Sequence, residues 1–343
     1  MPWLCIECQK LNADDESLCC HCKEPAPDDA DRVPFELVDR YRIVRVISTG
    51  GMGRVFRGWD REKNRPVAIK EMLVTSVDPE ERQYAQARFM QEVDFLGRLN
   101  HQALPRLVDF FVVRQKKGDG IIHYLVMEYI SGQDLGNIMK DLGGKPMDTP
   151  GAMSFFLQLL DVLSYLHYGD PPIVYRDLKP SNVMIRQGKL FLVDFGIARE
   201  YNPGSKGTQI GTPGYAAPEQ YQGICQPRSD LYSLGVLMHY LLTGIDPEGD
   251  DRPTFTFEPV KELNRDVPDT TSELIGRMLS LPVRDRPSSA LDVYFQLDAV
   301  KATRCLLGSL ARQAGLFWTK FVANFIPGSS KSSPGKTRFH ILR

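Results

Sequence analysis

The fold class of this 343-residue chain follows from residues 175–182, Tyr175-Arg176-Asp177-Leu178-Lys179-Pro180-Ser181-Asn182. Two short apolar runs come next, 183–185 and 190–193, and they are joined by Arg186-Gln187-Gly188-Lys189. This pattern predicts a β-hairpin whose outer ends carry Asn182 and Asp194. An amide oxygen and a carboxylate brought together in this way are ligands that suit Mg²⁺ bound to substrate phosphates.

A second hairpin is predicted upstream. Apolar alternation over 41–47 leads into a glycine cluster and then into Arg54-Val55-Phe56-Arg57-Gly58. The turn contains Gly50, Gly51 and Gly53. Glycines let backbone amides approach phosphate oxygens without a side-chain clash, although many hairpins have glycine turns for other reasons.

Residues 67–70, Val-Ala-Ile-Lys, predict a buried strand that ends in Lys70. A buried lysine is costly unless a carboxylate or phosphate meets it. Glu92, on a helical stretch whose apolar face includes Phe89 and Leu96, is the candidate partner; the alternative is a solvated surface acid. Residues 124–129 predict a core strand that runs into a hinge at Ser131-Gly132.

The next helix is expected to begin at residues 149–150. Thr149 is a suitable N-cap and Pro150 a suitable first-turn residue. The apolar spacing of Phe156, Leu159 and Leu163 predicts that this helix is buried.

The order of these motifs resembles the protein-kinase family from about Tyr41 to Leu297. The resemblance implies an α+β, bilobal protein-kinase fold over residues 38–300, with a small β-rich N-lobe at 38–128 and a larger helical C-lobe at 133–300. It implies an ATP- and Mg²⁺-dependent (or Mn²⁺-dependent) enzyme that transfers the γ-phosphate to protein substrates. The run 177–180 and Thr212 resemble serine/threonine kinases, and residues 50–53 and 217–220 resemble the bacterial, Hanks-type branch.

The resemblance also implies roles for individual residues. Asp177 matches the catalytic base, Lys179 the γ-phosphate contact, and Lys70 with Glu92 the ion pair. Asn182 and Asp194 match the metal ligands. The nucleotide-binding positions are Ser48, Gly50, Gly51, Gly53, Val55, Ala68, Lys70, Met127, Glu128, Asp134, Asn182 and Asp194. Glu219, Asp230 and Arg286 match buried structural anchors.

Two positions depart from the family pattern. Ser48 replaces the first loop glycine, and Tyr175 replaces the usual histidine of the catalytic loop. An ATP-binding pseudokinase scaffold is therefore the alternative interpretation. Against it, all five groups that degenerate kinases tend to lose are present: Lys70, Glu92, Asp177, Asn182 and Asp194.

The resemblance predicts regulation by activation-loop phosphorylation. Arg176 and Arg199 match the family's phosphate pocket, and Thr208 matches the phosphoacceptor. Phosphate on Thr208 would pair with these arginines and order residues 194–219. The alternative is an exposed loop threonine without consequence.

Five of the seven cysteines lie between positions 5 and 22. The pairs Cys5-x-x-Cys8 and Cys19-x-x-Cys22 suit one tetrahedral Zn²⁺, although Cys20 or His21 could replace a ligand. We expect a zinc ribbon at 1–24 and an acidic, Pro-rich linker at 25–37.

The ribbon resembles Ran-binding-protein-type zinc fingers, which bind ubiquitin or single-stranded RNA, and also zinc ribbons joined to bacterial kinases. An adaptor that binds ubiquitin or RNA is therefore a further alternative. Residues 1–34 carry eight acids and three bases, which disfavours nucleic acid as a partner. The ribbon is then either only a folded cap or a docking site for a protein partner.

The tail, residues 301–343, carries eight bases and no acid. Its apolar residues recur near helical spacing, so the tail is either an amphipathic helix on an anionic membrane surface or a helix packed on the larger lobe. A chain with 42% hydrophobic and 25% charged residues and no secretory signal is expected to be globular and cytoplasmic. If the tail is the membrane-bound helix, it would place the protein at the periphery of the membrane.

Overall fold

The computed structural model describes residues 3–5, 10–13, 16–25, 33–34, 36–50, 53–72, 79–114, 121–201, 211–248 and 255–297. Thr208, Gly51, Cys8 and the tail 301–343 lie outside these ranges, so the two interpretations of the tail stay predictions. Within the described residues, no helix is long and apolar enough to cross a bilayer.

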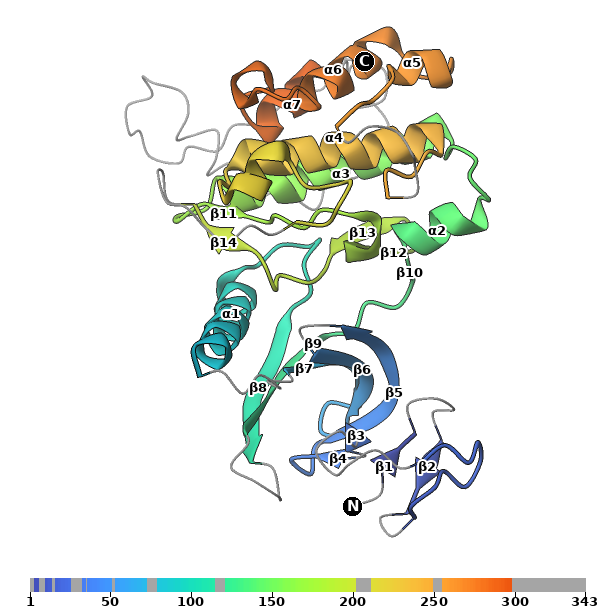
Figure 1. The fold of residues 1–343 in the computed structure, drawn as a ribbon, viewed down its shortest axis with the longest axis vertical. Coiled ribbons are helices and arrows are strands. Elements are labelled where there is room, and N and C mark those ends of the chain that lie inside the picture. Colours follow the sequence, from blue (N-terminus) through green and yellow to red (C-terminus); the bar gives the residue numbers. More distant parts are fainter. Residues whose placement is uncertain are drawn as a thin grey trace, which may run out of the picture. The chain divides into compact units, whose positions relative to one another are not determined.

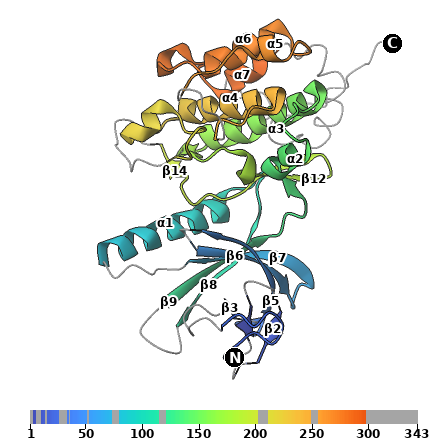
Figure 2. The same cartoon turned by 45° about the vertical axis from the view of Figure 1, so that its right-hand side comes forward.

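The N-lobe is a curled antiparallel sheet with one long helix, α1 (Pro79–Arg98), beside it (Figures 1 and 2). The strands are β4 (Glu36–Leu37), β5 (Tyr41–Gly50), β6 (Gly53–Asp60), β7 (Arg65–Met72), β8 (Leu107–Arg114) and β9 (Ile121–Glu128). Their order is β4-β5-β6-β7-β9-β8. On β6 every second residue is buried, as expected for a strand that buries one face. The buried face holds Tyr41, Phe56, Ile69 and Tyr124.

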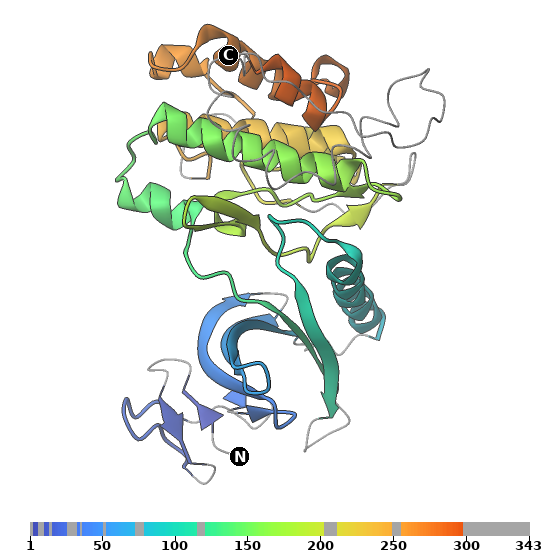
Figure 3. The same cartoon turned by 180° about the vertical axis from the view of Figure 1, so that it is seen from behind.

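The C-lobe is mainly helical. Its first elements are β10 (Gln133–Asp134), α2 (Leu135–Asp141), α3 (Thr149–His167), β11 (Ile173–Val174), η1 (Pro180–Asn182), β12 (Val183–Arg186), β13 (Lys189–Leu192) and β14 (Arg199–Glu200). They are followed by η2 (Pro218–Gln222), α4 (Pro227–Thr243), α5 (Val260–Leu263), α6 (Asp269–Met278), η3 (Val283–Asp285) and α7 (Ala290–Gln296). Helices α3 and α4 pack together in the centre of the lobe, as Figure 3 shows from behind.

The predicted bilobal α+β fold is confirmed, and the hairpin β12–β13 forms where the sequence indicated it. One detail differs. Asp148, not Thr149, caps α3, because its carboxylate accepts the N–H of Gly151 at 2.9 Å. Aspartate is as good an N-cap as threonine, and Thr149 becomes the first helical residue.

The amino-terminal segment forms a second small sheet. Strand β1 (Trp3–Leu4) pairs with β2 (Leu11–Asn12) and with β3 (Val33–Pro34). The sequence predicts a linker at 25–37, but here the structure differs. Within that stretch β3 belongs to this small amino-terminal sheet and β4 to the N-lobe sheet, and only residue 35 separates them.

Candidate active site

Five of the residues expected to bind nucleotide share one face of the N-lobe sheet. Side chains of directly opposite residues in an antiparallel pair point to the same side. Val55 lies opposite Lys70 and Ser48, and Ala68 lies opposite Met127. Because Ala68 and Lys70 are two residues apart on β7, both rows face the same way. The phosphate loop tip follows, where Gly50 pairs with Gly53.

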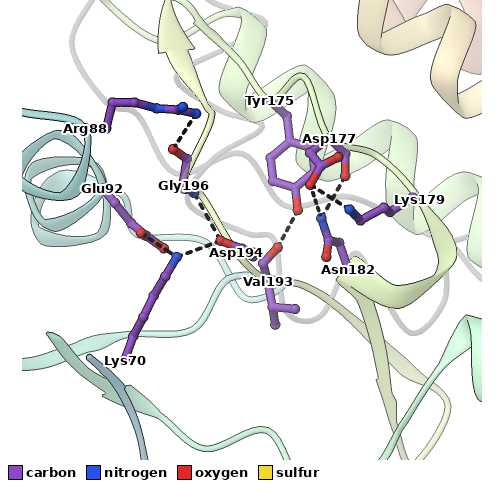
Figure 4. A network of polar contacts seen from close by, with 10 residues as sticks. All are labelled: Lys70, Arg88, Glu92, Tyr175, Asp177, Lys179, Asn182, Val193, Asp194 and Gly196. Carbon is purple, nitrogen blue, oxygen red and sulfur yellow. Dashed lines mark hydrogen bonds and ion pairs between the residues drawn. The ribbon is translucent and has the colours of Figure 1, made fainter. Parts of the chain in front are cut away.

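Lys70 lies between two carboxylates (Figure 4). Its Nζ donates to Glu92 Oε1 and Oε2 at 3.0 and 2.7 Å and to Asp194 Oδ1 at 2.8 Å. Glu92 is on α1 and is 2% exposed, so the interpretation as a solvated acid is wrong. The structure thus joins β7, α1 and the segment after β13 through one ammonium group.

Burial and the charges of this cluster together shift all three pKa values. Burial would lower the pKa of Lys70, but Glu92 and Asp194 raise it above its usual range. Burial raises the pKa of Glu92, and Lys70 offsets this only in part. Loss of water around the carboxylate would raise the pKa of Asp194, but the charge of Lys70 and the hydrogen bond from the Gly196 N–H lower it below its usual range. Lys70 and Asp194 therefore stay charged at neutral pH.

Asp177 is the centre of a second polar group. Asn182 Nδ2 donates to Asp177 Oδ2 and to the Asp177 carbonyl, both at 2.9 Å. Thr212 Oγ1 donates to Asp177 Oδ1 at 2.7 Å and accepts from Lys179 Nζ at 2.9 Å. Lys179 Nζ also lies 3.1 Å from Asp177 Oδ2. Because Asn182 binds Asp177 through its nitrogen, its amide oxygen is left to act as a ligand.

Two residues of the site have left-handed backbones, Arg176 with φ +74° and Asp194 with φ +63°. Such conformations cost a non-glycine residue of order 1–3 kcal/mol and persist only where the surroundings hold them. Asp230, fully buried on α4, accepts the N–H groups of Tyr175 and Arg176 at 2.8 Å each.

Tyr175 supports the segment that carries Asp194. Its hydroxyl donates to the Val193 carbonyl, and its ring packs edge-on against Phe195 with centroids 5.3 Å apart. Burial raises the pKa of Tyr175 well above its usual value. The substitution of tyrosine for the usual histidine thus keeps an aromatic contact and supplies a donor that does not titrate near neutral pH.

Three further residues expected from the family resemblance, Glu128, Asp134 and Glu219, make contacts with other parts of the protein. The Glu128 side chain lies 3.3 Å from Arg186 and connects β9 to β12. The carboxylate of Asp134 caps α2 by accepting the Asn137 N–H at 2.9 Å, a local role that the sequence did not suggest. Glu219 forms the buried ion pair with Arg286, at 2.7 and 2.9 Å.

The sequence analysis missed Arg88. This α1 residue donates to the Gly196 carbonyl at 3.1 Å, and burial together with the charge of nearby Arg176 lowers its pKa. Its spacing of four from Glu92 places both on one helix face, and this spacing was a usable signal.

Of the residues predicted to be regulatory, Arg199 pairs with Val174 across β11–β14, two residues from Arg176, whereas Thr208 lies outside the described residues.

Three cysteines of the amino-terminal segment converge. The Sγ atoms of Cys5, Cys19 and Cys22 lie within 4.8 Å of one another, and Cys5 and Cys22 are 3.6 Å apart. Cys20 and His21 do not belong to this group among the described residues, which disfavours the ligand swap. Cys8 lies outside the described residues.

The chain matches the family described as Protein kinase domain over residues 41–296. Serine/threonine-protein kinase pkn3 of Myxococcus xanthus is 31% identical over 334 residues, which cover 90% of this chain and 58% of that protein. Serine/threonine-protein kinase PknA of Mycobacterium tuberculosis is 35% identical over 255 residues, 71% of this chain and 57% of that protein. Serine/threonine-protein kinase B of Synechocystis sp. is 34% identical over 284 residues, 78% and 47% respectively. The chain thus spans about half the length of these relatives.

Proposed function

Because this chain belongs to the protein kinase family, among relatives that are serine/threonine kinases, we propose that it transfers the γ-phosphate of ATP to serine or threonine hydroxyls of protein substrates. The observation that carries the proposal is the contact of Lys70 with both Glu92 and Asp194, because it ties α1 to the segment expected to bind metal. A pseudokinase would not need this arrangement together with an Asp177 that Asn182 and Lys179 orient.

Phosphoryl transfer asks a protein mainly for alignment and charge neutralisation. Lys70 would hold the α- and β-phosphates, and Asn182 and Asp194 would hold Mg²⁺, which neutralises phosphate charge when it is bound. Asp177 would accept a hydrogen bond from the substrate hydroxyl, orient its oxygen and take up its proton. Lys179, next to Asp177, would stabilise the charge on the transferring group.

The substitution Asp177→Asn tests the proposal. We expect phosphate transfer to a generic basic protein to fall about a hundredfold or more, the scale of a lost general base, while nucleotide binding is kept. Transfer of label and equilibrium binding of ATP are measured on the same preparations. Glu262→Gln, an exposed acid on α5, is the control and keeps full activity. An equal rate in wild type and Asp177→Asn contradicts the assignment.

We also propose that Cys5, Cys8, Cys19 and Cys22 bind structural Zn²⁺. Tetrahedral Zn–S bonds of about 2.3 Å place sulfurs about 3.8 Å apart, close to the 3.6 Å between Cys5 and Cys22 and too long for a disulfide. Both cysteine turns contain the same backbone hydrogen bond, in which the N–H of the first cysteine donates to the carbonyl five residues later. The bond joins Cys5 to Lys10 at 3.0 Å and Cys19 to Glu24 at 2.8 Å. This repetition supports Cys8 as the equivalent of Cys22.

For regulation, we propose that phosphorylated Thr208 pairs with Arg176 and Arg199, with Arg88 as a third cation. Burial is the main cause that lowers the Arg88 pKa, and the nearby charge of Arg176 lowers it further. A phosphate placed near these two cations would be stabilised. Mass mapping of protein incubated with ATP should find phosphate at Thr208, and Thr208→Ala should lower activity. Active wild type without phosphate at Thr208 rejects this mechanism.

A further inference from the structure

Gln220 lies in η2, directly after the Glu219 of the buried ion pair, and its side chain is completely buried. Its amide oxygen accepts the N–H of Ala217 at 3.0 Å, and its amide nitrogen donates to the carbonyl of Arg176, also at 3.0 Å. A primary amide supplies an acceptor and a donor at once, which a carboxylate cannot do. The identity of this residue is therefore set by two different partners.

The Arg176 carbonyl belongs to the peptide group that joins Arg176 to Asp177. Arg176 has a left-handed backbone, and its N–H is already held by the buried carboxylate of Asp230 at 2.8 Å. With Gln220 on the carbonyl, buried side chains fix the peptide groups on both sides of Arg176. The direction in which the chain enters Asp177 is thereby determined.

Gln220 also lies close to Gly211, the first residue of the described range 211–248. A Cβ placed on Gly211 would lie 2.3 Å from the Cβ of Ala216 and 3.7 Å from Gln220 Nε2, so this segment passes close to the amide. Thr212, the next residue, donates to the Asp177 carboxylate. Residues 211–220 thus act on Asp177 at two points: Thr212 contacts its side chain, and Gln220 contacts the peptide group that precedes it.

We propose that Gln220 is a positioning residue for phosphoryl transfer, which holds the Arg176–Asp177 peptide so that Asp177 meets the substrate hydroxyl. This inference rests on the proposed kinase activity. Because Gln220 acts on the peptide that precedes Asp177 and not on the Lys70 cluster, its loss should lower kcat and leave the KM for ATP nearly unchanged.

Two variants separate positioning from simple packing. Gln220→Ala removes both hydrogen bonds. Only the bond to the Arg176 carbonyl positions Asp177, so we expect kcat to fall about tenfold, the scale of one lost buried hydrogen bond. Gln220→Glu has nearly the same shape and still accepts from Ala217, but its ionised form has no proton to donate to Arg176. Protonation restores the donor, and burial raises the pKa of such a carboxyl. The ratio of the kcat of Gln220→Glu to that of wild type should therefore rise as the pH falls from 8 towards 6.

Gln222→Glu is the matched control, because Gln222 is exposed on the same η2. Its kcat should equal that of wild type at every pH, and thermal melts at each pH report whether all variants are folded. If wild type and Gln222→Glu transfer phosphate and Gln220→Glu gives a constant ratio, the positioning role is wrong while the kinase activity stands. If wild type transfers none, the proposed function itself fails. If neither Gln220 variant folds, the amide is a folding requirement and the proposal is rejected.

Discussion

The Lys70 ammonium shows how a single residue depends on its charged partners. It is 6% exposed, and the two carboxylates that it contacts, Glu92 and Asp194, differ in environment, since Glu92 is 2% exposed and the Asp194 side chain 47%. Removal of the cation would leave a buried carboxylate at Glu92 without its counter-charge, which is far more costly than the loss of a surface ion pair.

Lys70→Met should abolish phosphate transfer, because the group expected to hold the phosphates is lost. It should also make the folded protein more stable at acidic than at basic pH. Burial already raises the Glu92 pKa in the intact protein, and loss of Lys70 raises it further. A carboxyl whose pKa is higher in the folded state stabilises the fold below its unfolded pKa, and this contribution is lost as the pH rises through the folded pKa. We expect chemical denaturation to show that Lys70→Met is more stable near pH 5 than near pH 8. In the double variant Lys70→Met/Glu92→Gln this difference should disappear; if it persists, another group is responsible.

At the scale of elements, the sequence predicted those whose local signals are strong. The hairpin β12–β13 and the apolar face of α3 were correct because turn residues and periodicity are local properties. The N-cap was misplaced by one residue, since Asp148 and Thr149 are both good caps and only the backbone geometry distinguishes them.

Contacts between distant elements were harder to predict. The sequence offered Glu92 as a candidate partner of Lys70, but the Arg88 contact with Gly196 and the Gln220 contact with Arg176 were not foreseen, because they join segments far apart in the chain. The helical spacing from Glu92 could indicate which face of α1 carries Arg88, but not which distant residue it contacts. Likewise, nothing in residues 25–37 distinguished a linker from two strands, because strands of two residues carry almost no periodicity.

The Glu219–Arg286 pair tests how η2 is fixed to the end of the C-lobe. Arg286 is 3% exposed, and its guanidinium also donates to the carbonyls of Ser280 and Leu281. Arg286→Met should lower the free energy of unfolding by about 3–5 kcal/mol, because Glu219 would stay buried without its partner. Arg284→Met is the control: that side chain is 87% exposed on η3 and should change stability little. Equal melting temperatures for the two variants would show that the pair does not stabilise the lobe.

At the scale of the whole described chain, the amino-terminal sheet and the N-lobe sheet are consecutive, because β3 pairs with β1 and β4 pairs with β5. A segment this small buries too little apolar surface to fold alone, so bound zinc, worth about 10–16 kcal/mol in finger peptides, would supply its stability. We therefore expect zinc release to free β3 and, through residue 35, to loosen β4 at the sheet edge.

We expect elemental analysis to find zinc in wild type and to find none in Cys19→Ser or Cys8→Ser. Hydrogen exchange should accelerate in residues 33–37 of both variants while α3 and α4 are unchanged. Cys20→Ser is the matched control, because Cys20 is exposed and outside the sulfur cluster, and it should keep the metal and wild-type exchange. If Cys20→Ser loses as much zinc as Cys19→Ser, our assignment of the four ligands is wrong. Zinc lost from Cys19→Ser without faster exchange at residues 36–37 would mean that the ribbon is attached to the kinase domain without stabilising its first strand, since the β4–β5 pairing would then hold independently of the metal.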